Sequence, residues 1–178
     1  CVRVEAYLQG DTSKYDSTSN AGPMTELEYW RRRMQRLTSI TEQLKTKECK
    51  LVLSLLPTLT KSVHDGSQQP AFGLLRRWKQ IDINITEAAN EAKDNVKYLF
   101  TLEKFLEPLY SGKPSNVIDT LPALMNSIKM IHTIARYYNT TERMTTLFVK
   151  ITNQMIINAK QCIVEQDMDL WNQKPEKL

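Results

Sequence analysis

The sequence ITEAANEAKDNVKYLFTLEKFLEPLY, from Ile85 to Tyr110, decides the fold class that we predict for this chain. It contains no glycine, its only proline comes late, at Pro108, and its apolar residues recur at steps of three and four. Such spacing places apolar side chains on one face of an α-helix. Extended upstream, the pattern predicts one long helix from about Leu74 to Leu109. A helix of this length needs neighbouring helices to bury its apolar stripe.

The apolar stripe of this helix has a mean step near the ~3.5 residues of a coiled-coil seam. Its middle is lined by small residues and its ends by bulky ones, so a neighbouring helix is expected to approach closely at the centre. The expected members of the stripe are Trp78, Ile81, Ile85, Ala88, Ala92, Val96, Leu99, Leu102, Leu106 and Leu109.

Helical periodicity also predicts two helices before this stretch. Thr25-x-x-Glu28 has the spacing of a capping box and opens an amphipathic helix over residues 24–46. The segment from Glu48 to Gly66 is more apolar on all sides, so we expect a buried helix that Pro57 kinks or ends. The expected buried residues of the first helix are Leu27, Trp30, Met34, Leu37, Thr41 and Leu44.

Two further helices are predicted after the long one. Ser115 is the expected cap of a helix over residues 116–138, and Thr140 or Thr141 is the expected cap of a last helix that ends near Glu165. The expected buried residues are Ile118, Leu121, Met125, Ile128, Ile131 and Ala135 in the first of these, and Leu147, Phe148, Ile151, Met155, Ile156, Ala159 and Cys162 in the second.

These patterns predict an all-α chain, arranged as an elongated bundle of about five long helices with short links. Residues 1–22 are expected to be the end of a preceding helix followed by a flexible loop, because residues 9–22 are rich in Ser, Thr, Asp, Asn and Gly. Residues 23–178 are expected to form the helical bundle. The chain lacks an initial Met, and we interpret it as a segment of a longer polypeptide.

The composition does not favour a nucleic acid or a membrane as the partner of this chain. A net charge of +4 on 178 residues does not require a nucleic acid, and no apolar run approaches the ~18 residues of a membrane span. The three cysteines are widely spaced, which is typical of a reducing compartment.

No pattern in the sequence is typical of a catalytic, cofactor-binding or metal-binding site. Gly112-Lys113 lacks the upstream glycine of a phosphate-binding loop, and Pro114 occupies the position of its Ser or Thr. His64 and His132 have no carboxylate at the spacing of a zinc protease. We therefore predict no catalytic, cofactor or metal residue in this chain.

Two sets of residues remain as candidates for a structural or interaction role. Six bulky residues are expected to be packing anchors, namely Trp30, Trp78, Leu99, Phe105, Tyr137 and Phe148. A basic run and an acidic cluster form a candidate partner surface, namely Arg31, Arg32 and Arg33 with Glu87, Glu91 and Asp94. The alternative interpretation of both charged groups is a solvated helix face.

Several stretches resemble the N-terminal stem of dynein heavy chains. GPMTELEYWRRRMQRLTSITEQL, from Gly22, is similar to the G-P-[ML]-x-E-[IL]-E-[FYW]-W signature of that stem. RRWKQIDINITEAANEAKDNVKYLFTLEKFLEPLY, ALMNSIKMIHTIARYYNTTERMTTLFVKITNQMI and LWNQKPEKL follow in the same order as in the family. The resemblance covers about Gly22 to Leu178, and it is closer to axonemal than to cytoplasmic chains, with outer-arm character.

The resemblance implies a non-catalytic stem segment of a microtubule motor whose ATPase ring lies far towards the C-terminus. Such a stem is built of helical bundles, and its work is heavy-chain assembly, attachment of intermediate and light chains, and force transmission. The implied partners are other dynein heavy chains, dynein intermediate and light chains and axonemal docking components, with no nucleic acid and no direct membrane contact. The implied location is the cytoskeleton of the ciliary or flagellar axoneme, and no cofactor is implied for this segment.

Two other functions stay open on the residues alone. A free-standing helical module could tether proteins or bind an anionic membrane surface through a basic face. After the stem segment and the helical module, the third hypothesis is a helical enzyme with a carboxylate-bound metal, although the E-x-x-H pattern of such sites is absent.

Overall fold

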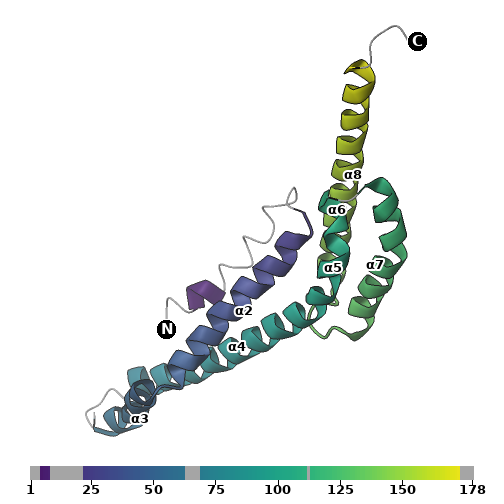
Figure 1. The fold of residues 1–178 in the computed structure, drawn as a ribbon. Coiled ribbons are helices and arrows are strands. Elements are labelled where there is room, and N and C mark those ends of the chain that lie inside the picture. Colours follow the sequence, from purple (N-terminus) through teal and green to yellow (C-terminus); the bar gives the residue numbers. More distant parts are fainter. Residues whose placement is uncertain (1–4, 9–21, 63–68, 112, 173–178) are drawn as a thin grey trace. The chain divides into compact units, whose positions relative to one another are not determined.

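A computed structural model describes residues 5–8, 22–62, 69–111 and 113–172 of the chain (Figure 1). Every regular element in these residues is a helix, which confirms the predicted all-α class. The long helices are α2 (Met24–Leu44), α3 (Lys47–Ser62), α4 (Gln69–Leu99), α7 (Pro114–Ile134) and α8 (Thr141–Asn172). The 3-10 helix η2 (Phe100–Leu102) and the short helices α5 (Glu103–Leu106) and α6 (Pro108–Ser111) lie between α4 and α7.

The predicted long helix is interrupted in the structure. α4 ends at Leu99, ten residues before the expected end at Leu109, and the chain continues through η2, α5 and α6. The Thr101 hydroxyl donates a hydrogen bond of 2.7 Å to the Tyr98 carbonyl, and such local bonds compete with the regular α-helical ladder. Pro108, which has no N–H to donate, begins α6. The apolar stripe nevertheless persists through the break, because Leu102, Leu106 and Leu109 are all buried.

The helix caps differ from the sequence prediction at α7 and agree with it at α8. α7 begins with Pro114 at its first position and Lys113 as its cap residue, so the expected cap at Ser115 is wrong. Proline is favoured at this position because the first N–H groups of a helix have no partner within it. At α8 the Thr140 hydroxyl accepts a hydrogen bond of 3.3 Å from the Arg143 N–H, as an N-cap residue does.

The chain divides into two compact units. The first unit comprises Cys1–Ser17 and Trp30–Lys93, and the second comprises Thr18–Tyr29 and Asp94–Leu178. The buried residues of the first unit include Trp30, Arg33, Leu37, Ile81, Ile85 and Ala92. In this unit Arg77 also forms an ion pair with Glu5, and this hydrogen bond lowers the pKa of the Glu5 carboxyl.

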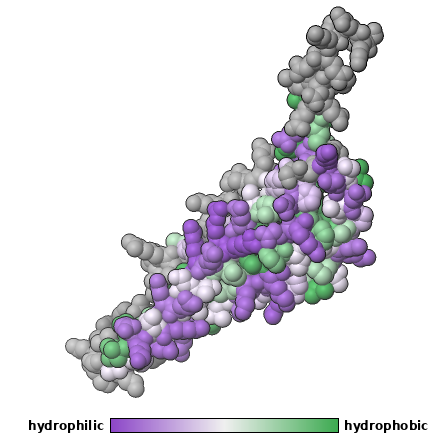
Figure 2. Space-filling model, in the orientation of Figure 1, coloured by the Kyte–Doolittle hydropathy of each residue, from purple (hydrophilic) through white to green (hydrophobic). Residues whose placement is uncertain are grey.

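α3 is not the buried helix that its composition predicts. Leu51, Val52 and Leu55 are at least half exposed, and Figure 2 shows apolar surface at the end of the molecule where α3 lies. Apolar composition favours burial but does not supply a neighbouring helix, and no described residue covers these three side chains.

The second unit is a helical bundle. η2, α5 and α6 contact α7, and α6 and α7 both contact α8 (Figure 1). Its buried apolar residues are Leu27, Leu99, Leu102, Leu106, Leu109, Val117, Leu124, Ile128, Ile131, Ala135, Tyr138, Met144, Leu147 and Ile151.

The predicted core faces of α7 and α8 are only partly correct, because Ile128, Ile131 and Ala135 on the first and Leu147 and Ile151 on the second are buried as expected. On α7, Val117 and Leu124 are buried, whereas the expected Ile118 and Met125 are exposed. On α8 the inward face also carries Lys150, Gln154 and Asn158, which hydrophobicity could not identify.

Candidate functional site

The start of α2 is held against the rest of the second unit, and we call residues 22–27 the anchor segment. The Met24 N–H donates a hydrogen bond of 3.1 Å to the Tyr110 hydroxyl at the end of α6. The segment itself forms a tight turn, because the Thr25 N–H and the Thr25 hydroxyl both donate to the Gly22 carbonyl, at 3.1 and 2.7 Å. The turn thus brings the backbone of Gly22 close to side chains from α6 and α8.

The close approach at position 22 favours glycine, which has no Cβ atom. A Cβ atom at Gly22 would overlap the Tyr110 hydroxyl and would lie 2.8 Å from Oε1 of Gln154. The Gln154 side chain is buried, and its Nε2 donates a 3.3 Å hydrogen bond to the Leu109 carbonyl. Any larger residue at this position would therefore have to displace the anchor segment or both neighbouring side chains.

Glu26 places a carboxylate in the interior of the second unit, where it is only 1% exposed. Its Oε2 accepts a hydrogen bond of 2.9 Å from Nζ of Lys150 on α8, and its Oε1 accepts one of 3.0 Å from the Tyr138 hydroxyl. Lys150 and Tyr138 are buried as well. The Glu26 carboxylate therefore joins the anchor segment, the α7–α8 connection and α8 through two charge-assisted bonds.

A buried ion pair of this kind positions chain segments and does not suggest catalysis. Removing two charges from water is costly, and good geometry with additional hydrogen bonds is what offsets that cost. Both carboxylate oxygens of Glu26 are engaged, which leaves little capacity for a substrate. The site can specify how the anchor segment docks, because any other register would bury a charge without its partner.

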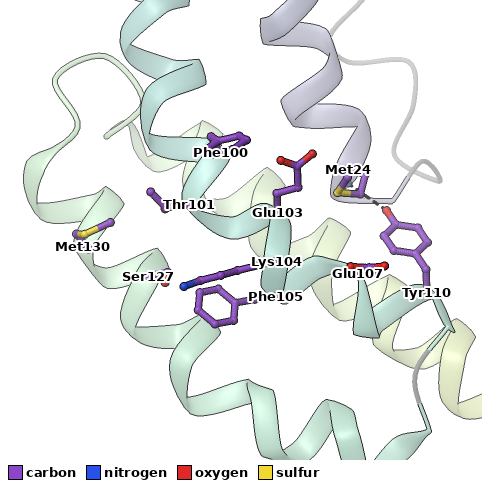
Figure 3. A pocket seen from close by; sticks show the side chains of 10 residues that line it. All are labelled: Met24, Phe100, Thr101, Glu103, Lys104, Phe105, Glu107, Tyr110, Ser127 and Met130. Carbon is purple, nitrogen blue, oxygen red and sulfur yellow. Dashed lines mark hydrogen bonds between the residues drawn. The ribbon is translucent and has the colours of Figure 1, made fainter.

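A groove with a volume of about 970 Å³ lies beside the anchor segment (Figure 3). Figure 3 shows Lys104 extending from α5 towards Ser127 on α7, and its Nζ lies 4.7 Å from the centroid of the Phe105 ring. Burial raises the pKa of the Tyr110 phenol above its usual value, so this hydroxyl stays protonated while it accepts the Met24 bond. The lining residues are Met24, Phe100, Thr101, Glu103, Lys104, Phe105, Glu107, Tyr110, Ser127 and Met130.

The part of the chain that the structure describes contains neither a candidate metal site nor a candidate membrane span. There, no group of three or more His, Cys, Asp or Glu side chains could hold a metal ion. No described helix is both long and apolar enough to cross a bilayer.

The six expected packing anchors differ in burial. Trp30 and Leu99 are buried, and Trp78, Phe105 and Tyr137 are partly buried. Phe148 is 39% exposed, so the expectation of a core position is wrong for this residue. The inward face of α8 holds Leu147 and Ile151 together with polar residues, and Phe148 points away from it.

The expected charged surface is only partly at the surface. In the first unit Arg32 and Glu87 are exposed and Arg31 and Glu91 are partly buried. Arg33 is buried, with its guanidinium 5.9 Å from the centroid of the Tyr7 ring, so its side chain is not available to a partner. In the second unit, Asp94 accepts a 3.2 Å hydrogen bond from the Arg136 N–H.

Sequence reasoning missed the polar residues of the interior. Glu26, Lys150 and Tyr138 were not predicted to meet, because they come from distant segments and two of them are charged. Asn95 was missed although a signal existed, since a strict seven-residue repeat through Ala88 and Leu102 places Asn95, and not Val96, in the stripe of α4. Asn95 is fully buried, and its amide oxygen and nitrogen have no hydrogen-bond partner among the described residues.

The known proteins that this chain resembles are dynein heavy chains. Residues 2–178 match the family described as dynein heavy chain, N-terminal region 1. The chain is 48% identical over 173 residues to the dynein gamma chain of the flagellar outer arm of Chlamydomonas reinhardtii, which covers 97% of this chain and 4% of that protein. It is 42% identical over 182 residues to mouse dynein axonemal heavy chain 5, covering 99% of this chain and 4% of the relative.

A more distant relative is an inner-arm protein. The chain is 33% identical over 152 residues to the dynein-1-alpha heavy chain of the flagellar inner arm I1 complex of C. reinhardtii, covering 85% of this chain and 3% of that protein. The chain therefore spans only a few per cent of the length of the relatives that it matches.

Proposed function

Because this chain belongs to the dynein heavy-chain family, as part of its N-terminal region 1, we propose that it is a non-catalytic stem segment that holds a motor complex together. Its work in this proposal is heavy-chain assembly, attachment of intermediate and light chains, and transmission of force in an axonemal motor. The relatives named above come from flagellar outer and inner arms or are axonemal chains, which supports an axonemal location.

The docking of the anchor segment against the second unit is the observation that carries this proposal. It contains the start of the stem signature, and two of its residues, Gly22 and Glu26, make the contacts that dock it. Gly22 allows close approach to Tyr110, and Glu26 forms the buried ion pair with Lys150. A segment that transmits force needs contacts that allow one arrangement only, and buried directional bonds supply such specificity.

The proposed partners are other heavy chains, intermediate and light chains, and axonemal docking components. We assign the packing anchors to the internal stiffness of the segment. Among the charged candidates, Arg32 and Glu87 are the ones whose side chains are exposed for contact with a partner. The same proposal includes a role in ciliary or flagellar motility for the full heavy chain.

Co-purification from cells that express full-length heavy chain tests the proposal. Deletion of residues 22–178 is expected to abolish recovery of intermediate chains and of other heavy chains with the tagged protein. Glu26→Ala is expected to weaken that recovery, whereas Glu42→Ala, an exposed carboxylate on the same helix, is the matched control and should leave it unchanged. ATP hydrolysis by the motor should survive the deletion. Intact recovery of all chains after the deletion would refute the assembly role.

A further inference from the structure

α8 carries a second apolar face that points away from its own bundle. Val149, Ile156 and Ile163 follow one another at intervals of seven, and they are 45%, 46% and 58% exposed. Thr152 and Ala159 lie between them and are exposed too. The steps of three and four, with β-branched residues at every seventh position, are those of a coiled-coil seam. We call these five residues the outer seam.

The outer seam lies opposite the buried face of α8. Successive residues of an α-helix are rotated by about 100°, so residues two and five positions after a seam residue lie about 200° and 140° away from it. Ile151 and Gln154 stand at those positions relative to Val149, and Asn158 stands two after Ile156; all three are buried. One side of the helix therefore serves the second unit, and the other side is free of contacts that would bury it.

The outer seam continues past the point where the bundle ends. Asn158 is the last buried residue of α8 among those described, although the helix runs on to Asn172. Figure 1 shows this part of α8 extending beyond α6 and α7. A helix segment with no covering neighbour is marginal in water, because its stability comes mainly from packing of an apolar face. The end of α8 therefore requires a neighbour.

We propose that the outer seam is covered by a helix of the same heavy chain that lies after residue 178 in the full-length protein. The chemical character of the outer seam indicates which kind of helix can cover it. The seam and its flanks are nearly uncharged, with Lys160 as the one charged side chain among residues 148–164 on this side. A facing helix must match this with a largely apolar stripe, because a charge buried against the seam away from Lys160 would have no counter-charge.

The exposed area favours a helix of the same chain over a second copy of the chain. The apolar residues exposed on this side of α8 present an area on the order of 500 Å², which is as large as the largest patch of an ordinary monomer. Two copies meeting there would bury roughly 1,000 Å², below the ~1,200–2,000 Å² of a stable interface. A helix of the same chain has no such requirement, because linkage gives it a high effective concentration.

The relatives supply the length of chain that this requires. The described family is an N-terminal region, and the matched stretch is 4% of the first relative, so most of a full-length heavy chain lies outside the segment. The inference depends on membership of this family and not on the assembly role. Its failure would leave the co-purification results unaffected.

Photo-crosslinking of the full-length heavy chain in its assembled complex tests the inference. Benzoylphenylalanine is placed at Ile156 or at Ile163, and crosslinked peptides are identified by mass spectrometry. Both positions are expected to crosslink to one helical segment after residue 178 of the same polypeptide. The control position is Gln161, which is exposed but lies five residues after Ile156, on the other side of α8. It should not crosslink to that segment.

Three outcomes of this experiment overturn the inference. Crosslinks to a second heavy chain would show that the seam joins two copies, and crosslinks to another subunit would show an intermolecular partner. Crosslinking at Ile163 no stronger than at Gln161 would show an uncovered seam. Hydrogen exchange gives an independent readout in the same complex. Ile163→Asp should raise exchange across residues 156–164 by roughly tenfold or more, whereas Gln161→Asp should leave it unchanged.

Discussion

The replacement of Glu26 by alanine is expected to destabilise the second unit severely. The carboxylate is 1% exposed, and the Lys150 side chain with which it pairs is 5% exposed. Alanine would leave the Lys150 ammonium in the interior without its counter-charge, which typically costs ~3–5 kcal/mol. It would also remove the acceptor of the Tyr138 hydroxyl. Urea unfolding of the purified chain, followed by far-UV circular dichroism, measures the free-energy change.

A double variant separates the ion pair from the packing of its side chains. Glu26→Leu with Lys150→Met removes both charges and keeps similar volumes, so most of the loss is expected to be recovered, because buried pairs are often replaceable by apolar residues. The two single changes and the double change form a cycle whose coupling energy should be roughly 2 kcal/mol or more. Glu42→Ala on the exposed side of α2 should stay within ~0.5 kcal/mol of the unchanged chain.

Either of two results would contradict the assigned role of the Glu26–Lys150 ion pair. A loss below ~1 kcal/mol for Glu26→Ala would mean that Lys150 reaches water or another partner when the carboxylate is gone. A coupling energy near zero would mean that the two side chains do not interact in solution, and the docking of the anchor segment would need another explanation.

Three further predictions concern packing, and each is checked by urea or thermal unfolding of the purified chain. Gly22→Ala should cost ~1–3 kcal/mol through overlap with the Tyr110 hydroxyl; Tyr110→Phe should recover part of this loss, and no recovery would place the strain elsewhere. Asn95→Leu should raise stability by ~1–2 kcal/mol, because it removes a buried amide without hydrogen bonds; a loss would reveal a partner for that amide. Trp30→Ala should cost ~3–5 kcal/mol, whereas Phe148→Ala should cost clearly less, since Phe148 is exposed; equal losses would contradict the assigned face of α8.

The periodicity of apolar residues was a reliable guide where the interior is apolar. The stripe of the long helix was predicted from Trp78 to Leu109. Its Ile and Leu members are buried even where the helix is interrupted at Phe100, whereas Trp78 and Val96 are only partly buried. The interruption itself was not predictable from the stripe, because the repeat of apolar residues does not change there. Asn95 shows a second limit of the apolar pattern. A search for apolar residues selects Val96 and omits the polar Asn95, although Asn95 occupies the seam position.

Hydrophobicity identified only the first part of the buried face of α8, where Leu147 and Ile151 are buried as predicted, for a physical reason. The inward face includes Lys150, Gln154 and Asn158, and burial of Lys150 is offset by Glu26, which lies more than a hundred residues away in the sequence. A single helix cannot show that a distant carboxylate will pair with one of its lysines. The outward face then holds the remaining apolar residues, including Phe148 and Ile156, and the pattern alone cannot tell which of two faces is covered by this chain.

A cryo-electron microscopy reconstruction of an assembled axonemal dynein that contains this heavy chain would show where the segment lies and which chains it contacts. The account predicts that residues 22–178 are helical and lie outside the ATPase ring. It also predicts that Glu26 lies within hydrogen-bond distance of Lys150, and that the segment contacts at least one other chain of the complex. A segment that lies within the ring, or that contacts no other chain anywhere along its length, would contradict the assignment of a stem that holds the motor together.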